Sequence, residues 1–351
     1  MSLIQELDSH FAPLESTEEF DWYDGAQMPI YGSAWQSESD GFCRLPDRAQ
    51  SLLREPVWEL SRHSAGIALE FTSNAKSLAV RWNLRNEALA MPHMAATGVS
   101  GCDLYARKDG RWRWMAIVQP TAQKNEAVVV NDLDGQTREY RLYLPLYNGV
   151  TSLQIGVSRG ASLASATEKY ARKPICFYGT SIVQGGCASR PAMAYPAILS
   201  HRLDWPAINL GFSGNAHCES EIADLLGELD PQIYVLDPLP NMNAEMIEER
   251  LENFILTLRA SRPNTPIVLV ENIIYAHAIW LRQSDEIWRG SNAAARAIYQ
   301  KLRRADENLH LIPTADLLGD DGEATVDGVH PTDLGFARMA DVIAPVLQSL
   351  L

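Results

Sequence analysis

Two short stretches of this chain, far apart in sequence, hold residue types that together form a serine nucleophile. Ser181 stands among glycines in the stretch 179–186, GTSIVQGG, and Asp327 precedes His330 by three residues in DGVHP. A serine hydroxyl attacks a carbonyl carbon when an imidazole accepts its proton, and a carboxylate on the other ring nitrogen fixes the tautomer. We therefore predict that Ser181, His330 and Asp327 are catalytic residues.

Two further stretches offer groups that could stabilise the oxyanion of such a reaction. Gly214 lies in NLGFSGN, residues 209–215, and Asn241 lies in DPLPNM, residues 237–242. A glycine can turn its backbone N–H toward a negative oxygen, and an asparagine can add its amide. We predict an oxyanion hole made of Ser181, Gly214 and Asn241.

Each motif also has a structural explanation when it is taken alone. A serine after a strand often caps a helix, and Asp, Gly and Asn residues commonly close turns. The glycine-rich loop could instead cradle a phosphate, but it lacks the lysine of a P-loop and the G-x-G-x-x-G spacing. The functional interpretation depends on all four motifs meeting in space.

The second half of the chain alternates between apolar strands and amphipathic helices. This order predicts a doubly wound parallel sheet with helices on both faces. Sites in such sheets form beyond the carboxyl ends of the strands, where three of the four motifs lie. The strands are expected at 175–179, 207–212, 232–237, 266–272 and 309–314, and the helices at 194–203, 219–229, 244–261 and 292–305.

The first half reads as short strands that are separated by turn residues. In 78–82 the apolar residues Leu78, Val80 and Trp82 alternate with their neighbours, and Asp109-Gly110 is typical of a hairpin turn. This pattern predicts an antiparallel β-sandwich. The small, polar stretch 158–174 suggests a boundary, which gives a sandwich domain at 1–165 and a catalytic domain at 172–351.

The four motifs, in this order, resemble those of the SGNH (GDSL-type) hydrolase superfamily over residues 174–350. Gly101-Cys102-Asp103-Leu104-Tyr105 resembles the G-x-D-L-Y motif of a branch with an N-terminal sandwich. The resemblance implies a flavodoxin-like sheet after a jelly-roll-like sandwich, and the triad and oxyanion roles predicted above. Two features depart from the family pattern: Thr180 stands where Asp is frequent before the serine, and D-P-L-P-N-M replaces G-x-N-D.

The predicted function is a serine esterase that removes small acyl groups, acetyl in particular, from carbohydrates or other small molecules. An acyltransferase that uses the same acyl-enzyme, and a carbohydrate-binding protein with an inactive hydrolase domain, are the alternatives. In the loop 91–94, His93 and Met94 are candidate substrate-binding residues. Alternatively, the methionines fill the core and His93 belongs to a turn.

Composition narrows the partners and the compartment. The formal net charge is −14, and no basic run could follow a nucleic acid backbone. No apolar stretch has the length of a membrane span, and residues 1–20 lack an export-signal pattern. Five scattered cysteines include no C-x-x-C pair, so we expect neither a metal nor a cofactor. We expect a cytoplasmic enzyme, and a homo-oligomer is compatible with the sequence.

Overall fold

The computed structural model describes residues 20–39, 41–166 and 172–351. Residues 1–19, which hold nearly all of the stretch predicted to lack an export signal, and residues 167–171 of the predicted boundary lie outside these ranges. Within them, no helix is both long and apolar enough to cross a membrane.

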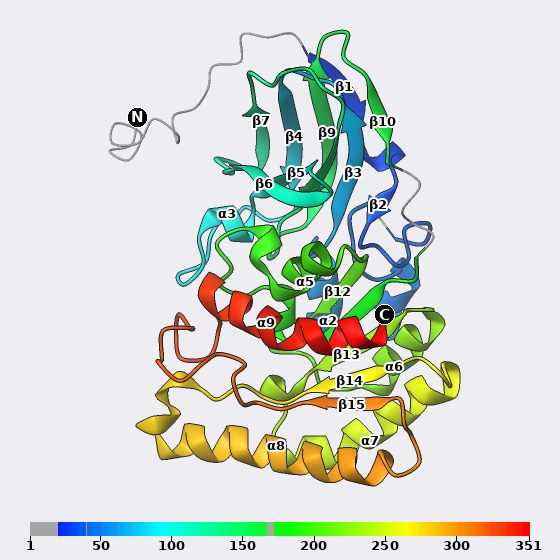
Figure 1. Ribbon diagram of the computed structural model, residues 1–351, viewed down its shortest axis with the longest axis vertical. Coiled ribbons are helices and arrows are strands. Elements are labelled where there is room, and N and C mark those ends of the chain that lie inside the picture. The colour runs from blue at the N-terminus through cyan, green and yellow to red at the C-terminus, as the bar shows by residue number, and fades with distance from the viewer. Residues whose placement is uncertain (1–19, 40, 167–171) are drawn as a thin grey trace.

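The N-terminal half forms two antiparallel sheets, as the sequence predicted (Figure 1). The first sheet has the order β1 (Phe20–Asp24), β9 (Val150–Ser158), β4 (Leu78–Leu84) and β7 (Lys124–Val130). The second has the order β10 (Leu163–Ser165), β3 (Ala68–Ser73), β8 (Arg138–Tyr143), β5 (Cys102–Lys108) and β6 (Arg111–Val118), with β2 (Ile30–Tyr31) paired to β3.

Alternation and turn chemistry explain these strands. Leu78, Val80 and Trp82 of β4 are buried between the sheets. Asp109 and Gly110 both have positive φ, at 52° and 73°, and they join β5 to β6 as a two-residue hairpin turn. Such a turn needs left-handed backbone at both positions, which Asp and Gly tolerate best.

The second half forms the predicted doubly wound parallel sheet. Its order is β12 (Ala207–Gly211), β11 (Ile175–Gly179), β13 (Ile233–Asp237), β14 (Ile267–Val270) and β15 (Leu309–Ile312), which is the flavodoxin-like order 2-1-3-4-5. Every residue of β11, β12, β13 and β14 is buried, because helices cover both faces.

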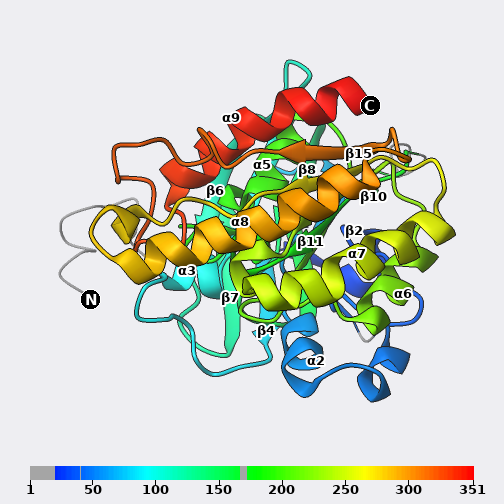
Figure 2. The same cartoon turned by 90° about the horizontal axis from the view of Figure 1, so that it is seen from below.

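Helices α5 (Tyr195–Leu203) and α9 (Asp333–Leu350) cover one face of this sheet, and α6 (Ser220–Glu228), α7 (Ala244–Ser261) and α8 (Arg282–Leu302) cover the other. Figure 2, which views the molecule from below, shows α7 and α8 on the near side of the sheet. In α7 the apolar residues Leu251, Ile255 and Leu258 are buried, whereas Met246 lies at the margin of that face.

Helix α8 begins ten residues before the predicted start at residue 292. Its first turns are polar and mostly exposed, so they carry little hydrophobic periodicity. Ion pairs at i,i+4 spacing, Arg282 with Glu286 and Arg289 with Asp285, support the helix there.

A segment of the N-terminal half packs against the hydrolase core. Between β2 and β3 the chain forms the short helices η3 (Asp47–Ser51) and α2 (Glu55–Ser61). Five of its buried side chains join the core cluster of the parallel sheet, namely Trp35, Leu45, Ala49, Val57 and Trp58. The two halves therefore share one core on this side.

The G-x-D-L-Y motif supplies a second contact between the halves. Asp103 of β5 is fully buried and accepts hydrogen bonds from Arg190 Nη1 at 2.7 Å and from the N–H of Ala192 at 3.1 Å. Arg190 Nη1 also donates to the Tyr105 hydroxyl at 2.7 Å. The motif thus holds the segment that precedes α5.

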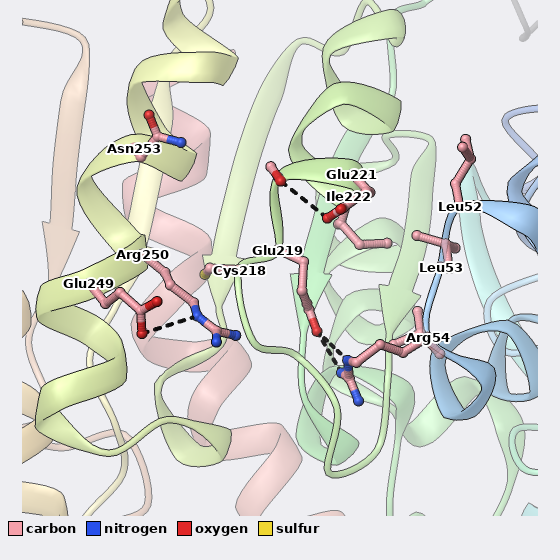
Figure 3. A pocket seen from close by; sticks show the side chains of 12 residues that line it. Leu52, Leu53, Arg54, Cys218, Glu219, Glu221, Ile222, Glu249, Arg250 and Asn253 are labelled. Carbon is pink, nitrogen blue, oxygen red and sulfur yellow. Dashed lines mark hydrogen bonds and ion pairs between the residues drawn. The ribbon is translucent and has the colours of Figure 1, made fainter.

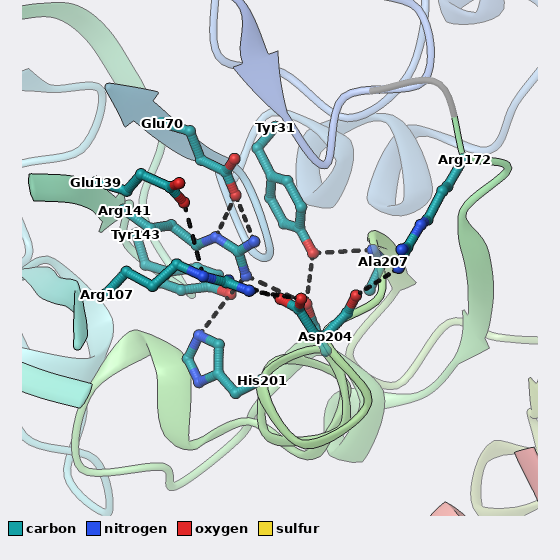
Figure 4. Close-up of polar contacts among 11 residues, drawn as sticks. Tyr31, Glu70, Arg107, Glu139, Arg141, Tyr143, Arg172, His201, Asp204 and Ala207 are labelled. Carbon is teal, nitrogen blue, oxygen red and sulfur yellow. Dashed lines mark hydrogen bonds and ion pairs between the residues drawn. The ribbon is translucent and has the colours of Figure 1, made fainter. Parts of the chain in front are cut away.

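A buried polar network completes the interface (Figure 4). Arg141 of β8 pairs with Glu70 of β3 and donates to Ser200 of α5 at 3.2 Å. Tyr31 lies 2.6 Å from the same serine hydroxyl and accepts from the N–H of Ala207 at 2.9 Å. These bonds fix the sandwich to both α5 and β12.

Candidate active site

Ser181 begins the short helix α4 (Ser181–Gln184), directly after β11. Thr180 is the N-cap residue, and its hydroxyl accepts from the N–H of Ile182 at 3.2 Å. Because Thr180 caps this helix, the hydroxyl of Ser181 is not needed for that role. Ser181 is 5% exposed and lies at the carboxyl edge of the sheet, where the sequence predicted a site.

The structure brings Ser181, His330 and Asp327 together. Ser181 Oγ lies 2.9 Å from His330 Nε2, although the two residues are 149 positions apart. His330 Nδ1 lies 2.7 Å from Asp327 Oδ2, while the N–H groups of His330 and Val329 donate to Oδ1 at 2.8 and 3.0 Å. Gly328 has a φ of 92°, and a Cβ there would lie 1.9 Å from His277 Nδ1, so this turn requires glycine.

The surroundings of Asp327 favour the ionised form of its carboxylate. Burial would raise the pKa of Asp327, but hydrogen bonds from His330 and Val329 outweigh it and hold that pKa below its usual range. By contrast, burial, with the Asp327 charge as a lesser cause, raises the pKa of the neighbouring Cys187 thiol to about 12. Cys187 is therefore a neutral thiol, which leaves Ser181 as the nucleophile candidate of the site.

Besides Ser181, the two other predicted oxyanion donors, Gly214 and Asn241, lie in adjacent loops. Gly214 follows β12 with a φ of 68°, and no atom lies within 4 Å of the position of a Cβ there. Asn241 ends the short helix η6 (Leu239–Asn241), and its Oδ1 accepts from the N–H of Ala216 at 3.2 Å. This bond joins the two loops.

Two residues that the sequence did not single out position the Gly214 loop relative to Ser181. Gln184, at the end of α4, accepts from the N–H of Ser213 at 3.0 Å and donates to the carbonyl of Leu146 at 3.0 Å. Tyr147, from the sandwich half, donates to the Ser181 carbonyl at 3.4 Å. No pattern in the sequence marks them, because their partners are distant along the chain.

Arg54 holds the outer side of the same loop. It donates to Glu219 Oε1 at 2.7 Å and to Asn215 Oδ1 at 2.9 Å. Figure 3 shows Arg54 in contact with Glu219, and both side chains line a cavity of about 430 Å³ together with residues of α7. The Arg54–Glu219 ion pair and the hydrogen bond between Gln184 and Ser213 therefore both restrain the Gly214 loop.

The two candidate substrate-binding residues differ in their surroundings. The His93 side chain is exposed, and its ring centroid lies 5.7 Å from that of His330. Met94 is 4% exposed and belongs to the core cluster around α5 and α9, which favours the packing role for it. The aromatic residues Tyr178 and Tyr195 are fully buried and cannot stack on a sugar.

The doubly wound sheet after an antiparallel sandwich, with Ser181, His330 and Asp327 in contact at the carboxyl edge of the sheet, defines the class as an SGNH-type fold. Comparison with protein families agrees: residues 172–348 match the GDSL-like Lipase/Acylhydrolase family, and residues 20–163 match the GxDLY family, described as the N-terminus of Esterase_SGNH_hydro-type. The chain belongs to the GDSL-like lipase/acylhydrolase family, which confirms the prediction of an ester hydrolase with a sandwich domain.

Solved structures give the same result. The chain is 33% identical to a protein from Bacteroides ovatus that is described as a GDSL-like lipase, with a TM-score of 0.90 over 95% of this chain and 98% of that one. A salicylyl-acyltransferase from a tetracycline biosynthetic pathway is 18% identical, with a TM-score of 0.76 over 94% and 97%. A family two carbohydrate esterase from Cellvibrio japonicus is 13% identical, with a TM-score of 0.63 over 95% and 98%. No curated protein matches the chain.

Proposed function

We propose that this protein hydrolyses small acyl esters, acetyl esters in particular, on carbohydrate or similar hydroxylated substrates. The observation that carries the proposal is the pair of contacts made by the His330 ring: Nε2 lies 2.9 Å from Ser181 Oγ and Nδ1 lies 2.7 Å from Asp327 Oδ2. This geometry lets one imidazole take the serine proton while the carboxylate stabilises the resulting cation.

The chemistry follows from these contacts. Ser181 Oγ attacks the ester carbonyl carbon as its proton passes to His330 Nε2, and the carbonyl oxygen becomes an oxyanion. In this proposal the N–H groups of Ser181 and Gly214 and the amide of Asn241 donate hydrogen bonds to that oxygen. His330 then returns the proton to the leaving alcohol, and a water molecule hydrolyses the acyl-enzyme by the same steps in reverse.

The exposure of the site favours hydrolysis over acyl transfer. The side chains of His330 and Asp327 are 25% and 41% exposed, so water reaches the base directly. A transferase must keep water away from its acyl-enzyme. The likeness to an acyltransferase, at 18% identity, concerns the fold alone.

The crowding beside Ser181 favours a small acyl group. A Cβ on Gly186 would lie 2.8 Å from the Tyr147 hydroxyl and 3.2 Å from the His330 ring, so little space remains on that side. In this proposal the alcohol half is a carbohydrate, and its test is left to the ester panel, because the likeness to the family two carbohydrate esterase, at 13% identity, also concerns the fold alone.

A panel of esters tests this proposal. We expect turnover of p-nitrophenyl acetate and of acetylated sugars, a fall in kcat/KM as the acyl chain lengthens, and no turnover by Ser181→Ala. His310→Ala, which changes a partly buried histidine on β15, should keep full activity, whereas His330→Ala should lose it. Turnover retained in Ser181→Ala, or a preference for long acyl chains, would contradict the proposal.

A further inference from the structure

Three side chains with metal-binding atoms meet beside the candidate active site. A ring nitrogen of His93, a ring nitrogen of His330 and the Sγ of Cys187 lie within 4.8 Å of one another. They come from three separate segments: the sandwich loop 91–94, the turn before α9 and the loop after α4. The mechanism proposed above uses His330 alone among them.

We propose that His93, Cys187 and His330 form a binding site for Zn²⁺ that switches the enzyme off. Zinc binds imidazole nitrogen and thiolate sulfur, so the Cys187 thiol, which is neutral without the metal, releases its proton to solvent as zinc binds. Zinc accepts three protein ligands with an exchangeable fourth position. Magnesium and calcium prefer oxygen ligands, which this group does not offer. The site should therefore take zinc and not the abundant hard cations.

The geometry is close to what a zinc ion needs. Bonds of about 2.0–2.3 Å at tetrahedral angles place ligand atoms roughly 3.3–3.8 Å apart. The present separations of up to 4.8 Å must therefore shorten by about 1 Å. Cys187 is 8% exposed and held at a φ of 72°, so it is the fixed member, whereas the exposed His93 can move.

The surroundings of His330 also suit a zinc ligand. Its Nδ1 is held by Asp327 at 2.7 Å, and a carboxylate in this position orients a histidine and makes its other nitrogen a better ligand. The nitrogen left for the metal is Nε2, which otherwise faces Ser181 Oγ. Zinc on Nε2 removes the proton acceptor of the serine, so the acyl-enzyme cannot form.

Direct binding tests the site without any reference to catalysis. In calorimetry of the full chain with ZnCl₂, we expect one site in the wild type and an affinity at least roughly tenfold weaker in Cys187→Ala, because the thiolate ligand is lost. Cys218→Ala is the matched control, since Cys218 is also buried, at a φ of 51°, and is not part of this group. Absent binding, or equal affinity in all three proteins, would overturn the site.

Inhibition tests the switch, which rests on the proposed function. ZnCl₂ should inhibit hydrolysis of p-nitrophenyl acetate, EDTA should restore it, and MgCl₂ should have no effect. With each variant measured against its own metal-free rate, Cys187→Ala should need at least roughly tenfold more zinc than the wild type and Cys218→Ala the same amount. Zinc that binds at this site without slowing turnover would overturn the switch. Zinc binding by a chain that has no metal-free activity would support the site and count against the proposed function.

Discussion

Arg54 offers a sharp test of how the Gly214 loop is positioned. Its guanidinium donates to Glu219 at 2.7 Å, and to the side chain and carbonyl of Asn215 at 2.9 and 3.3 Å. Arg54→Ala removes these bonds from the outer side of the loop, while Gln184 and Asn241 still hold Ser213 and Ala216. The loop should remain folded but lose its fixed position.

The magnitude follows from the proposed role of Gly214 as an oxyanion donor. Complete loss of one oxyanion donor costs about 3 kcal/mol, or roughly 10² in rate. Because the hydrogen bonds of Gln184 with Ser213 and of Asn241 with Ala216 persist, we expect kcat to fall about 10-fold to 100-fold with little change in KM. The Arg54 side chain is 41% exposed, so its ion pair should contribute at most about 1 kcal/mol to the free energy of unfolding.

The assay compares kcat, KM and Tm for three proteins. Arg48→Ala is the matched control, because Arg48 lies on η3, is 44% exposed and pairs with Glu38 and Glu228, away from the Gly214 loop. It should keep full kcat. The reasoning is refuted if Arg54→Ala keeps the wild-type kcat, or if Arg48→Ala loses as much.

Three other substitutions test separate parts of the structure. Asp327→Asn should lower kcat by roughly 10³ to 10⁴ while circular dichroism stays unchanged, because the wrong imidazole tautomer is favoured; a loss below tenfold would argue against the carboxylate. Burial raises the pKa of Asp237 to about 8 in spite of a hydrogen bond from Tyr195, whereas the unfolded chain has the ordinary pKa of about 4. The free energy of unfolding should therefore fall as pH rises from about 4 through about 8, by on the order of 5 kcal/mol, because the folded state holds the proton more tightly. Asp237→Asn should flatten that decline in urea unfolding, and an unchanged pH dependence would contradict this cause. Arg190→Ala leaves Asp103 buried and unpaired, so the free energy of unfolding should fall by about 3–5 kcal/mol, and a loss below about 1 kcal/mol would show that the contact is weak.

The sequence predicted the architecture because each half has a clear hydrophobic period. The alternation in β4 and the continuous apolar runs of β11 and β13 identify one-sided and two-sided burial directly. The prediction that Ser181 would meet His330 used the rule that ligand sites lie at the carboxyl ends of parallel strands, together with the resemblance of the four motifs to those of SGNH hydrolases.

The features that the sequence missed depend on contacts between distant residues. The segment around Trp35 and Trp58 buries its side chains against the hydrolase core, which no local period reveals. The first turns of α8 are polar on nearly all sides, so they lack an apolar stripe. Arg54 and Gln184 act through partners more than 25 positions away. The burial of Met94 depends on a core cluster that includes α5 and α9, which lie much later in the chain.

Covalent labelling of Ser181 tests the central claim most directly. A fluorophosphonate reacts only with a serine whose proton is taken by a neighbouring base, so mass spectrometry of the labelled chain should place a single adduct on the peptide that contains Ser181. His330→Ala should prevent the adduct, while His310→Ala should not. An unlabelled wild-type chain, or an adduct on another serine, would contradict the account.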